Sequence, residues 1–376
     1  MQNPKSRRII SRSMWRLLVG AIFITAVAML FNNCTGSFKA ATNTASLNGA
    51  SAPTPSNSTS SNSSSSSAST SSATTLSQEY PGDVGIQNDP SVVWSEHFDE
   101  GSIGAFVARY DTYDNEAGMS LVPDVPAGSA EKYAIQLTSN PTTGADATDF
   151  YKNFANFSSG YTDLYFRWYV KYQAGIPYHH TGVWFGGYNP PLNWPYPHAG
   201  QKPTGTDRFS IAIEPIWHVG TSNPVLDFYN YWMNMQSCSS CGGKYWGNEL
   251  VENNSFTADT TWECIEVHLA INTDMNSAAG SMLEVWKNNN LVQSFSPTGP
   301  AGGWVQDHYC PAGSTASQCQ YSYTLPGPAD LQVRTTSALN INYFWPQNYI
   351  TSGNGPGSVW YSNMVVATKR IGCLVP

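Results

Sequence analysis

The stretch Leu164-Tyr-Phe-Arg-Trp-Tyr-Val-Lys-Tyr172 alternates apolar and polar side chains at every second position. Successive side chains of a β-strand point to opposite faces, so this period of two predicts a strand with one buried face. Phe166, Trp168 and Val170 would share the buried face. The other face would carry a mixture of aromatic and charged side chains, namely Tyr165, Arg167, Tyr169 and Lys171.

Short alternating stretches of the same kind recur along the chain, separated by clusters of Gly, Pro, Asn and Asp. No apolar pattern of helical period runs for more than a turn or two. The pattern therefore indicates an all-β fold, an antiparallel β-sandwich. The other strands that we predict are Val92–Phe98, Lys132–Leu137, Val183–Phe185, Arg208–Ile216, Leu226–Met233, Trp262–Asn272, Met282–Trp286, Leu291–Ser294, Leu339–Phe344 and Val359–Ala367.

Three more of these strands place polar side chains opposite their apolar face. These side chains are Arg208, Ser210, Glu214, Asp227, Tyr229, Tyr231, Glu266 and His268. An ordinary solvated sheet face would be rich in Lys and Glu, whereas these faces are rich in Tyr and His, in a chain with 13% aromatic and 12% charged residues. Aromatic rings beside hydrogen-bonding groups suit sugars, which have apolar faces and hydroxyl rims. We therefore expect a ligand-binding sheet face.

The first residues carry five basic side chains and no acidic one, and an apolar run from Leu17 to Phe31 follows. This layout is typical of a secretory signal, and the run is shorter than the roughly 20 residues of a membrane-spanning helix, which is the alternative. The segment that ends in Asn32, Asn33 and Cys34 resembles a bacterial lipobox. We therefore predict a lipoprotein signal peptide at residues 1–33 and lipidation of Cys34.

Residues 34–79 consist largely of Ser, Thr, Ala and Asn, a composition that predicts a disordered tether. Residues 80–376 would form one β domain. Removal of the signal would leave 13 basic against 26 acidic residues, a net charge of −13. This charge argues against nucleic acid as a partner and leaves the lipid as the only link to a membrane. We expect an exported monomer anchored to the bacterial cell envelope, at the outer membrane.

Six cysteines follow Cys34, and an even number in an exported chain indicates disulfides. Six cysteines allow 15 pairings, so spacing alone does not choose among them. We favour the local pairs Cys238–Cys241 and Cys310–Cys319, which leave Cys264 to pair with Cys373. A zinc site is the alternative at Cys238-Ser-Ser-Cys241, but no second such pair completes it.

Several segments together resemble the strand series of concanavalin A-like jelly rolls, over roughly residues 92–372. They are Leu164–Tyr172, Gly182-Val-Trp-Phe-Gly-Gly187, Trp262–Asn272, Leu283-Glu-Val-Trp286, Val359–Val366 and Ile371-Gly372. Within that fold the likeness is strongest to polysaccharide lyases that act on alginate and glucuronan. The resemblance implies a jelly-roll domain that cleaves a uronic-acid polysaccharide, although this fold also hosts lectins and hydrolases.

Those lyases use a Tyr-x-Tyr pair on a concave strand, a Ser-x-Arg on the preceding strand and an earlier Lys. Tyr229-Asn-Tyr231 matches the tyrosine pair, and Ser210 matches the serine. Ala212 stands where the arginine would be, so Arg208, two residues before the serine, is the nearest arginine on that face. The lysine position falls in Gly182–Gly187, which has no lysine and is preceded by Tyr178-His179-His180.

β-Elimination needs a group that neutralises the uronate carboxylate, a base for the C5 proton and an acid for the leaving oxygen. Arg208, Arg167 or Lys171 could neutralise the carboxylate. The base and the acid would come from Tyr229, Tyr231, His179, His180 and His268. We expect the sugar to be contacted by Arg167, Tyr169, Lys171, His179, Ser210, Glu214 and Glu266.

Two alternatives remain open at this stage. A hydrolase would need two carboxylates across a groove, for which Glu214 and Glu266 are candidates, but the ExDxE strand motif of laminarinase-like hydrolases is absent. A non-catalytic lectin or an adhesive surface protein could use the same aromatic face. We expect no cofactor and no metal, although such folds can hold a structural calcium ion. Convergence of Arg208, Tyr229, Tyr231 and a histidine within about 5 Å would favour the lyase, because catalytic groups act within hydrogen-bond reach of the substrate.

Overall fold

The computed structural model describes residues 74–375, apart from 156–159, 196–198, 219–220, 222, 321–322 and 352–354. The predicted signal peptide, the lipidation site Cys34 and most of the predicted tether lie outside the described residues. Within the described part of the chain, no helix has the length and apolar character needed to cross a membrane.

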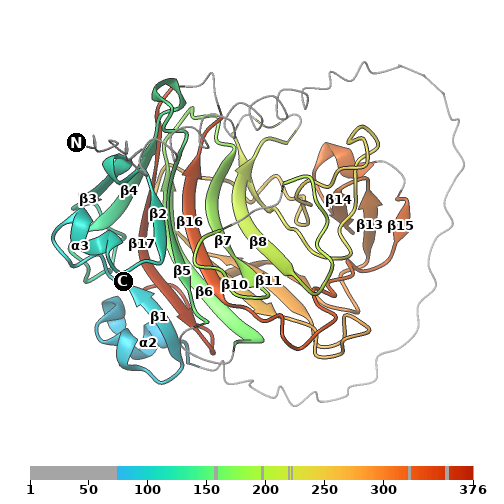
Figure 1. Ribbon diagram of the computed structural model, residues 1–376, viewed down its shortest axis with the longest axis horizontal. Helices are drawn as coiled ribbons and strands as arrows, with labels where there is room; N and C mark the ends of the chain where they lie inside the picture. The colour runs from blue at the N-terminus through green and yellow to red at the C-terminus, as the bar shows by residue number, and fades with distance from the viewer. Residues whose placement is uncertain are drawn as a thin grey trace, which may run out of the picture. The chain divides into compact units, whose positions relative to one another are not determined.

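The larger of two main sheets contains eight antiparallel strands (Figure 1). Seven of them form a continuous path, and β1 pairs beside it with β17. The order along the path is β12 (Asn290–Phe295), β11 (Met282–Lys287), β10 (Glu263–Ala270), β6 (Asp163–Tyr172), β17 (Gly357–Ala367), β4 (Ala134–Ser139) and β3 (Met119–Val122), with β1 spanning Val92–Glu96. We call this sheet A.

The second main sheet, sheet B, has six antiparallel strands and lies in front of sheet A in Figure 1. Its order is β2 (Thr112–Asp114), β5 (Ala147–Asn153), β16 (Tyr343–Tyr349), β7 (His180–Tyr188), β8 (Arg208–Ile216) and β9 (Val225–Phe228). A small third sheet consists of β14 (His308–Pro311), β13 (Gly302–Val305) and β15 (Leu325–Pro326).

Helical segments are short and lie mostly near the start of the domain. The α-helices are α2 (Leu76–Glu79) and α3 (Ile103–Val107). The 3-10 turns are η1 (Pro81–Asp83), η2 (Ile86–Asn88), η3 (Glu116–Gly118), η4 (Pro141–Thr143) and η5 (Ser317–Gln320). The described part of the chain is thus nearly all β, as the alternating pattern predicts.

The two main sheets pack face to face through the apolar positions of their strands. Phe166 of β6 stacks on Phe185 of β7 with ring centres 4.3 Å apart, and its ring lies 6.1 Å from that of Phe344 of β16. Phe166, Trp168 and Val170 are all buried, which confirms the predicted core face of β6. The β-sandwich prediction is therefore confirmed, and the outer faces of the two sheets point in opposite directions.

Each predicted strand corresponds to a strand of the structure, but several begin or end at different residues. β8 spans the predicted Arg208–Ile216, whereas β9 ends at Phe228 and β16 begins only at Tyr343. Residues 339–342, predicted as strand, precede β16, and Ile341 among them forms an isolated bridge with Tyr161. The strands β2, β3, β5 and β13 to β15 were not predicted: β5 has seven residues without a clear alternation of apolar and polar side chains, and the others have two to four residues each.

The ordered domain begins before the predicted boundary at residue 80. Leu76 is fully buried, and its backbone N–H donates to the Arg370 carbonyl at 3.2 Å. The Ser77 N–H donates to the Ile371 carbonyl at 2.8 Å, so α2 is fastened to the C-terminal tail. The last residues of the predicted tether therefore belong to the domain.

The three predicted disulfides are all present, which excludes the zinc alternative at the first pair. Cys238–Cys241 and Cys310–Cys319 close local loops. Cys264–Cys373 joins β10 to the C-terminal tail, across a sequence separation of 109 residues. This third bond holds the tail against the outer face of sheet A.

Arg167 is completely buried on the outer face of sheet A, so its predicted role as a sugar contact is wrong. Its guanidinium donates to both carboxylate oxygens of Asp83, at 2.7 and 2.8 Å, and to the Asn363 carbonyl at 2.8 Å. The Asn363 side chain also donates to Asp83 at 2.8 Å. The charge of Arg167 therefore serves to attach the N-terminal segment to the sheet.

We expect an Asp83→Asn variant to lose about 3 kcal/mol or more of its free energy of unfolding, because it leaves a buried guanidinium without its counter-charge. Chemical denaturation of the full chain measures this change. Glu79→Gln is the matched control, since the Lys369–Glu79 pair is about 40% exposed at Lys369 and 38% at Glu79. That control should change stability by less than about 1 kcal/mol. Equal effects of both substitutions would contradict the structural role of the buried pair.

Candidate functional site

The outer face of sheet B gathers aromatic and hydrogen-bonding side chains from its three central strands. Across β16 and β7, Tyr349 lies opposite His180 and Trp345 lies opposite Trp184. Across β7 and β8, Trp184 lies opposite Ala212. Directly opposed residues of neighbouring strands share a face, and Ala212 is small, so the two tryptophans can reach toward the segment that follows β9.

Tyr229 and Tyr231 enter this face from the segment after β9. The Tyr229 N–H donates to the Ala212 carbonyl at 3.0 Å, and Tyr231 exchanges two backbone hydrogen bonds with Ser210, at 2.8 and 2.9 Å. The two tyrosine hydroxyls lie 3.5 Å apart. Their rings lie 5.9 and 6.4 Å from that of Trp184. The structure thus brings the predicted tyrosine pair together on one face, with Ser210 contributing its backbone.

His180 lies beside Tyr229, with ring centres 4.8 Å apart. Its Nδ1 makes a 2.9 Å hydrogen bond with Glu214 Oε2, and the Glu214 side chain is 1% exposed. His179 stacks next to His180 at 4.0 Å. His180 and Tyr229 are half-buried, whereas Glu214 and Tyr231 behind them are buried. The accessible pair is therefore backed by two buried polar groups.

Burial controls the protonation of these groups. It lowers the pKa of His180 to about 4 and, with the neighbouring His180 ring, that of His179 to about 3. Burial also raises the pKa of the Glu214 carboxyl well above its ordinary range and that of the Tyr231 phenol to about 12. At neutral pH the imidazole of His180 is therefore uncharged, the form that a general base requires.

Arg208 is the cation at the end of this face. It is 3% exposed, and its guanidinium donates to Asp207 at 2.7 Å and to the Gln201 carbonyl at 2.8 Å. Its charge is near enough to lower the pKa of Tyr231, against the larger effect of burial that raises it. Arg208 thus does not point into solvent away from Tyr231, but Asp207 already offsets part of its charge.

Other predicted site residues lie on the outer face of sheet A and bind the chain itself. The Tyr169 hydroxyl accepts a hydrogen bond from the Leu374 N–H at 2.8 Å. The Glu266 carboxylate accepts from the N–H groups of Ile371 and Gly372, at 2.7 and 3.1 Å. The predicted sugar contacts of Tyr169 and Glu266 are therefore wrong, because the C-terminal tail occupies both side chains.

Lys171 and His268 also lie on the outer face of sheet A and bind other residues of the chain. Lys171 forms an ion pair with Asp124, so it is not a group of the tyrosine face. Both ring nitrogens of His268 bond carboxylates, Nδ1 with Glu284 at 2.9 Å and Nε2 with Asp163 at 2.8 Å. The predicted roles of Lys171 on the substrate carboxylate and of His268 as base or acid are therefore wrong.

The predictions for Tyr169, Lys171, Glu266 and His268 were wrong for one reason. Alternation distinguishes the two faces of a strand, but it does not say to which sheet the strand belongs. Glu214 lies on β8 of sheet B, whereas Glu266 lies on β10 of sheet A. Their side chains point away from the core on opposite sides of the sandwich. The two-carboxylate hydrolase alternative is excluded for this pair.

Several residues of the face were not predicted. They are Trp184, Tyr343, Trp345 and Tyr349, together with Asp149, whose pKa burial raises to about 7. Trp184 falls inside the quoted Gly182–Gly187 segment, where Gly on both sides of an aromatic pair was a usable signal. Trp345 and Tyr349 were missed because the predicted strand stopped at Phe344, whereas Tyr343 lay inside that strand but was not assigned to a face.

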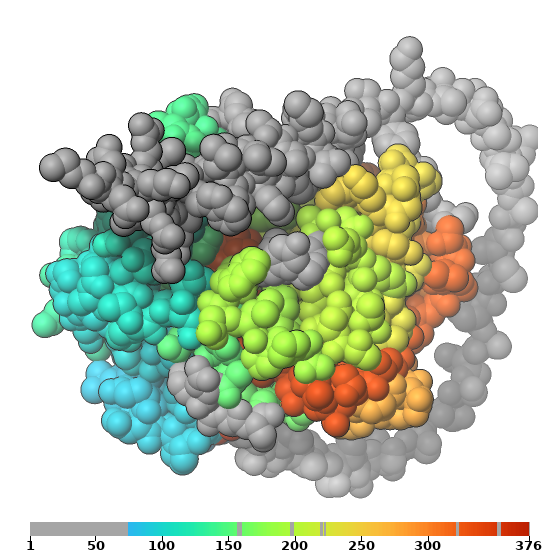
Figure 2. Space-filling model, in the orientation of Figure 1, coloured from blue at the N-terminus to red at the C-terminus, as the bar shows by residue number. Residues whose placement is uncertain are grey.

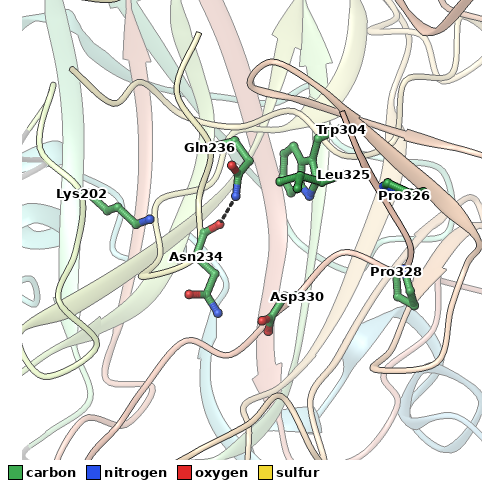
Figure 3. A pocket seen from close by; sticks show the side chains of 8 residues that line it. All are labelled: Lys202, Asn234, Gln236, Trp304, Leu325, Pro326, Pro328 and Asp330. Atoms are coloured by element: carbon green, nitrogen blue, oxygen red, sulfur yellow. Dashed lines mark hydrogen bonds between the residues drawn. The ribbon is translucent and has the colours of Figure 1, made fainter. Parts of the chain in front are cut away.

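A hollow of about 330 Å³ is lined in part by Asn234 and Gln236, which follow Tyr231 closely in the sequence (Figure 3). Loops near β8 and β9, yellow-green in Figure 2, make up the middle of the surface seen there. The Trp232 indole, directly after Tyr231, donates to the Asp330 carbonyl at 2.7 Å and so connects the tyrosine segment with the hollow. Its lining residues are Lys202, Asn234, Gln236, Trp304, Leu325, Pro326, Pro328 and Asp330.

No family model and no curated protein matches the chain. Similar solved structures include alginate lyase Aly36B, at 12% identity over 76% of this chain and 99% of that one, with a TM-score of 0.45. The marine PL-14 alginate lyase from Aplysia kurodai is 14% identical over 74% and 99%, with a TM-score of 0.45. An endo-β-1,4-glucuronan lyase from the fungus Trichoderma reesei is 12% identical over 73% and 94%, with a TM-score of 0.37.

Alginate and glucuronan lyases are thus among the solved structures similar to this chain.

The environment of His180 can be measured directly. We expect its imidazole to stay neutral from pH 7 down to about pH 5 and to titrate near pH 4, because burial disfavours the charged form. Histidine NMR titration, with the signal assigned by a His180→Asn variant, gives this pKa. His97 is the internal control, since its contact with Glu131 overcomes burial and raises its pKa above the usual 6.5. A His180 signal that titrates near 6.5 would contradict a buried imidazole.

Proposed function

We propose that the outer face of sheet B binds a uronic-acid polysaccharide and cleaves it by β-elimination. The observation that carries this proposal is the half-buried pair of His180 and Tyr229, backed by Glu214 and Tyr231. A neutral imidazole and a phenol that keeps its proton are the base and acid that elimination requires.

In the proposed reaction, the His180 imidazole takes the proton from C5 of the uronate. The electron pair of that C–H bond forms the C4=C5 double bond, and the bond from C4 to the glycosidic oxygen breaks. The Tyr229 hydroxyl donates its proton to the leaving oxygen. Glu214 lies 2.9 Å from Nδ1 of His180 and fixes the ring; in the reacting form Glu214 is a carboxylate that accepts the Nδ1 proton, so Nε2 has its lone pair free for the C5 proton.

Tyr231 and Arg208 support the pair. The Tyr231 hydroxyl, 3.5 Å from that of Tyr229, can pass a proton back after the leaving oxygen has taken one. Arg208 supplies positive charge near Tyr231, where it would stabilise the charge that develops on the uronate carboxylate. The net charge of the chain is −8, and it would be −13 without the predicted signal peptide, so the protein gains no long-range attraction for a polyanion and this local charge matters.

Aromatic rings give the sugar a surface to lie on. Tyr349 is half-buried and its ring lies 6.0 Å from that of His180, while Trp184 and Trp345 lie beneath, 5.8 Å apart. Such rings suit the apolar faces of pyranose rings. They would serve a lectin equally well, and the Asp207 carboxylate on Arg208 favours that second candidate function, because it weakens neutralisation of the uronate.

Cleavage can be tested with a panel of polyuronates and neutral glycans, by following absorbance of the new unsaturated ends. We expect Tyr229→Phe to lower kcat by roughly 100-fold or more, since the phenol proton is lost while the ring remains. Tyr113→Phe is the matched control, because Tyr113 on β2 is 42% exposed and remote from His180 in the sheet order. Binding without absorbance, unchanged in Tyr229→Phe and Tyr231→Phe, would show a lectin instead.

We also propose that the protein is displayed on the bacterial envelope by lipid on Cys34, with the Ser-rich tether holding the domain away from the membrane. A Cys34→Ala variant should move from the detergent phase to the aqueous phase in a detergent partition of cells that express the full chain. Ser37→Ala should stay with the detergent phase. Retention of Cys34→Ala in the membrane would instead indicate that the apolar run itself anchors the chain.

A further inference from the structure

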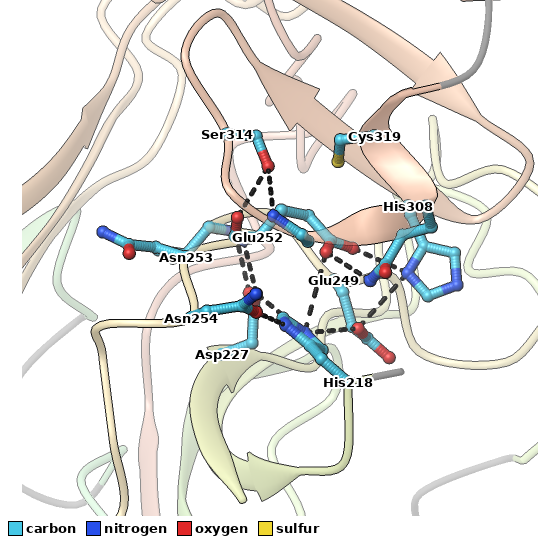
Figure 4. A network of polar contacts seen from close by, with 12 residues as sticks. His218, Asp227, Glu249, Glu252, Asn253, Asn254, His308, Ser314 and Cys319 are labelled. Atoms are coloured by element: carbon cyan, nitrogen blue, oxygen red, sulfur yellow. Dashed lines mark hydrogen bonds and ion pairs between the residues drawn. The ribbon is translucent and has the colours of Figure 1, made fainter. Parts of the chain in front are cut away.

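A second polar cluster, distinct from the tyrosine face, lies where β9 meets the loop 249–252 (Figure 4). It consists of His218, Asp227, Glu249 and Glu252, each of which offers one atom, and these four atoms all lie within 4.8 Å of one another. His218, Asp227 and Glu252 are at most 4% exposed, and the Glu249 side chain is 14% exposed. Three carboxylates so close together and so deeply buried require positive charge among them, and His308 supplies part of it, since its Nδ1 lies 3.2 Å from Glu249 and 2.7 Å from Glu252.

The histidine of this cluster presents a lone pair to the carboxylates. His218 Nδ1 lies 2.9 Å from the Asn254 side-chain carbonyl, an acceptor, so Nδ1 carries the proton in the neutral ring. Nε2 then points to the carboxylate oxygens of Glu249, Glu252 and Asp227, at 3.4, 3.6 and 4.0 Å, and makes no hydrogen bond. A buried acceptor that faces three further acceptors is repulsive, so either the ring takes up a proton or a cation lies between the ring and the carboxylates.

The rival arrangement is a protonated imidazolium, and His268 on sheet A shows what that arrangement looks like. Both nitrogens of His268 approach carboxylate oxygens closely, at 2.9 and 2.8 Å, within normal hydrogen-bond distance. The shortest distance from Nε2 of His218 to a carboxylate is 3.4 Å, beyond that range. Ligands held tetrahedrally at about 2.0–2.1 Å from one Zn²⁺ ion lie about 3.4 Å apart, which matches the His218 spacing.

We propose that His218, Asp227, Glu249 and Glu252 bind a first-row divalent metal ion, Zn²⁺ by preference. The imidazole nitrogen distinguishes this set from the all-oxygen sets of Ca²⁺ and Mg²⁺. The sequence pattern gave no sign of the site, because its ligands come from three separate segments and lack a short spacing.

The surroundings hold the carboxylates in place, as the outer partners of metal ligands do. Asp227 accepts backbone N–H bonds from Leu250 and Val251 on Oδ1, at 2.9 and 2.8 Å, and from Glu252 on Oδ2 at 2.7 Å. The other oxygen of Glu252 bonds His308 Nδ1 at 2.7 Å. These bonds orient Asp227 and Glu252, and the Glu252 oxygen nearest His218 also accepts a hydrogen bond from the Gln318 side chain.

The position of the site implies a structural role. Asp227 precedes Tyr229 by two residues, and the loop 249–252 begins two residues after Gly247, which packs against the Tyr229 ring. A metal ion would therefore join β9 to the loop that supports the tyrosines. This inference is independent of the proposed lyase activity, since its test measures metal content and stability.

The experiment uses the full chain, untagged and with disulfides intact, stripped with a chelator and then titrated separately with Zn²⁺ and Ca²⁺. We expect one Zn²⁺ per chain by elemental analysis, a rise of the unfolding midpoint by several degrees, and tetrahedral ligand-field bands when Co²⁺ is substituted. His218→Asn and, as a milder change, Glu249→Gln should lower the affinity for Zn²⁺ at least tenfold. His268→Asn, the matched control, should leave it unchanged.

Failure to bind Zn²⁺, or equal binding by the His218→Asn and unmodified chains, would overturn the proposal and leave the cluster as a network of ion pairs. Stabilisation by Ca²⁺ alone would overturn the assignment of His218 as a ligand. Should His218→Asn fail to fold, Glu249→Gln alone decides, because its side chain is the most exposed of the four.

Discussion

The contact on which the rest of the domain depends is the packing of Phe166 of sheet A against Phe185 and Phe344, which lie side by side on sheet B. It requires the apolar faces of β6, β7 and β16 to point inward together. A shift of one residue in any of these strands would turn its aromatic core outward, so the register is strongly determined. The polar side chains at the alternate positions then lie on the outer face of sheet A or on that of sheet B, and the core separates the two groups.

The two outer faces treat their polar groups differently. On sheet A, the N-terminal segment and the C-terminal tail cover the strands and take up their charges, as Arg167 does with Asp83 and Glu266 does with two backbone amides. The Cys264–Cys373 bond keeps that tail in place. Sheet B leaves His180 and Tyr229 partly accessible among aromatic rings. Among the described residues of the two outer faces, this histidine and tyrosine on sheet B are the ones that a substrate could reach as base and acid.

Three histidines illustrate how the same side chain takes different states in one fold. His268 sits between two carboxylates with hydrogen bonds to both, so its charged form is favoured and its pKa is raised to about 9 despite burial. His180 meets one carboxyl and several aromatic rings, and burial keeps it neutral. His218 faces three carboxylates without bonding them, which points to a cation. Local packing, rather than residue type, selects among these states.

Alternation at period two was sufficient to predict the sandwich, the core face of β6 and the pairing of Tyr229 with Tyr231, because these are local properties of strands. The even number of cysteines predicted disulfides, and the favoured pairing, two local pairs that leave Cys264 for Cys373, is the one that the structure contains. Only the tertiary structure decided that Arg167, Tyr169, Lys171, Glu266 and His268 belong to sheet A, and that Trp345 and Tyr349 join His180. Which strands share a sheet depends on pairing between segments far apart in the chain, and a pattern within one strand carries no information about its neighbours.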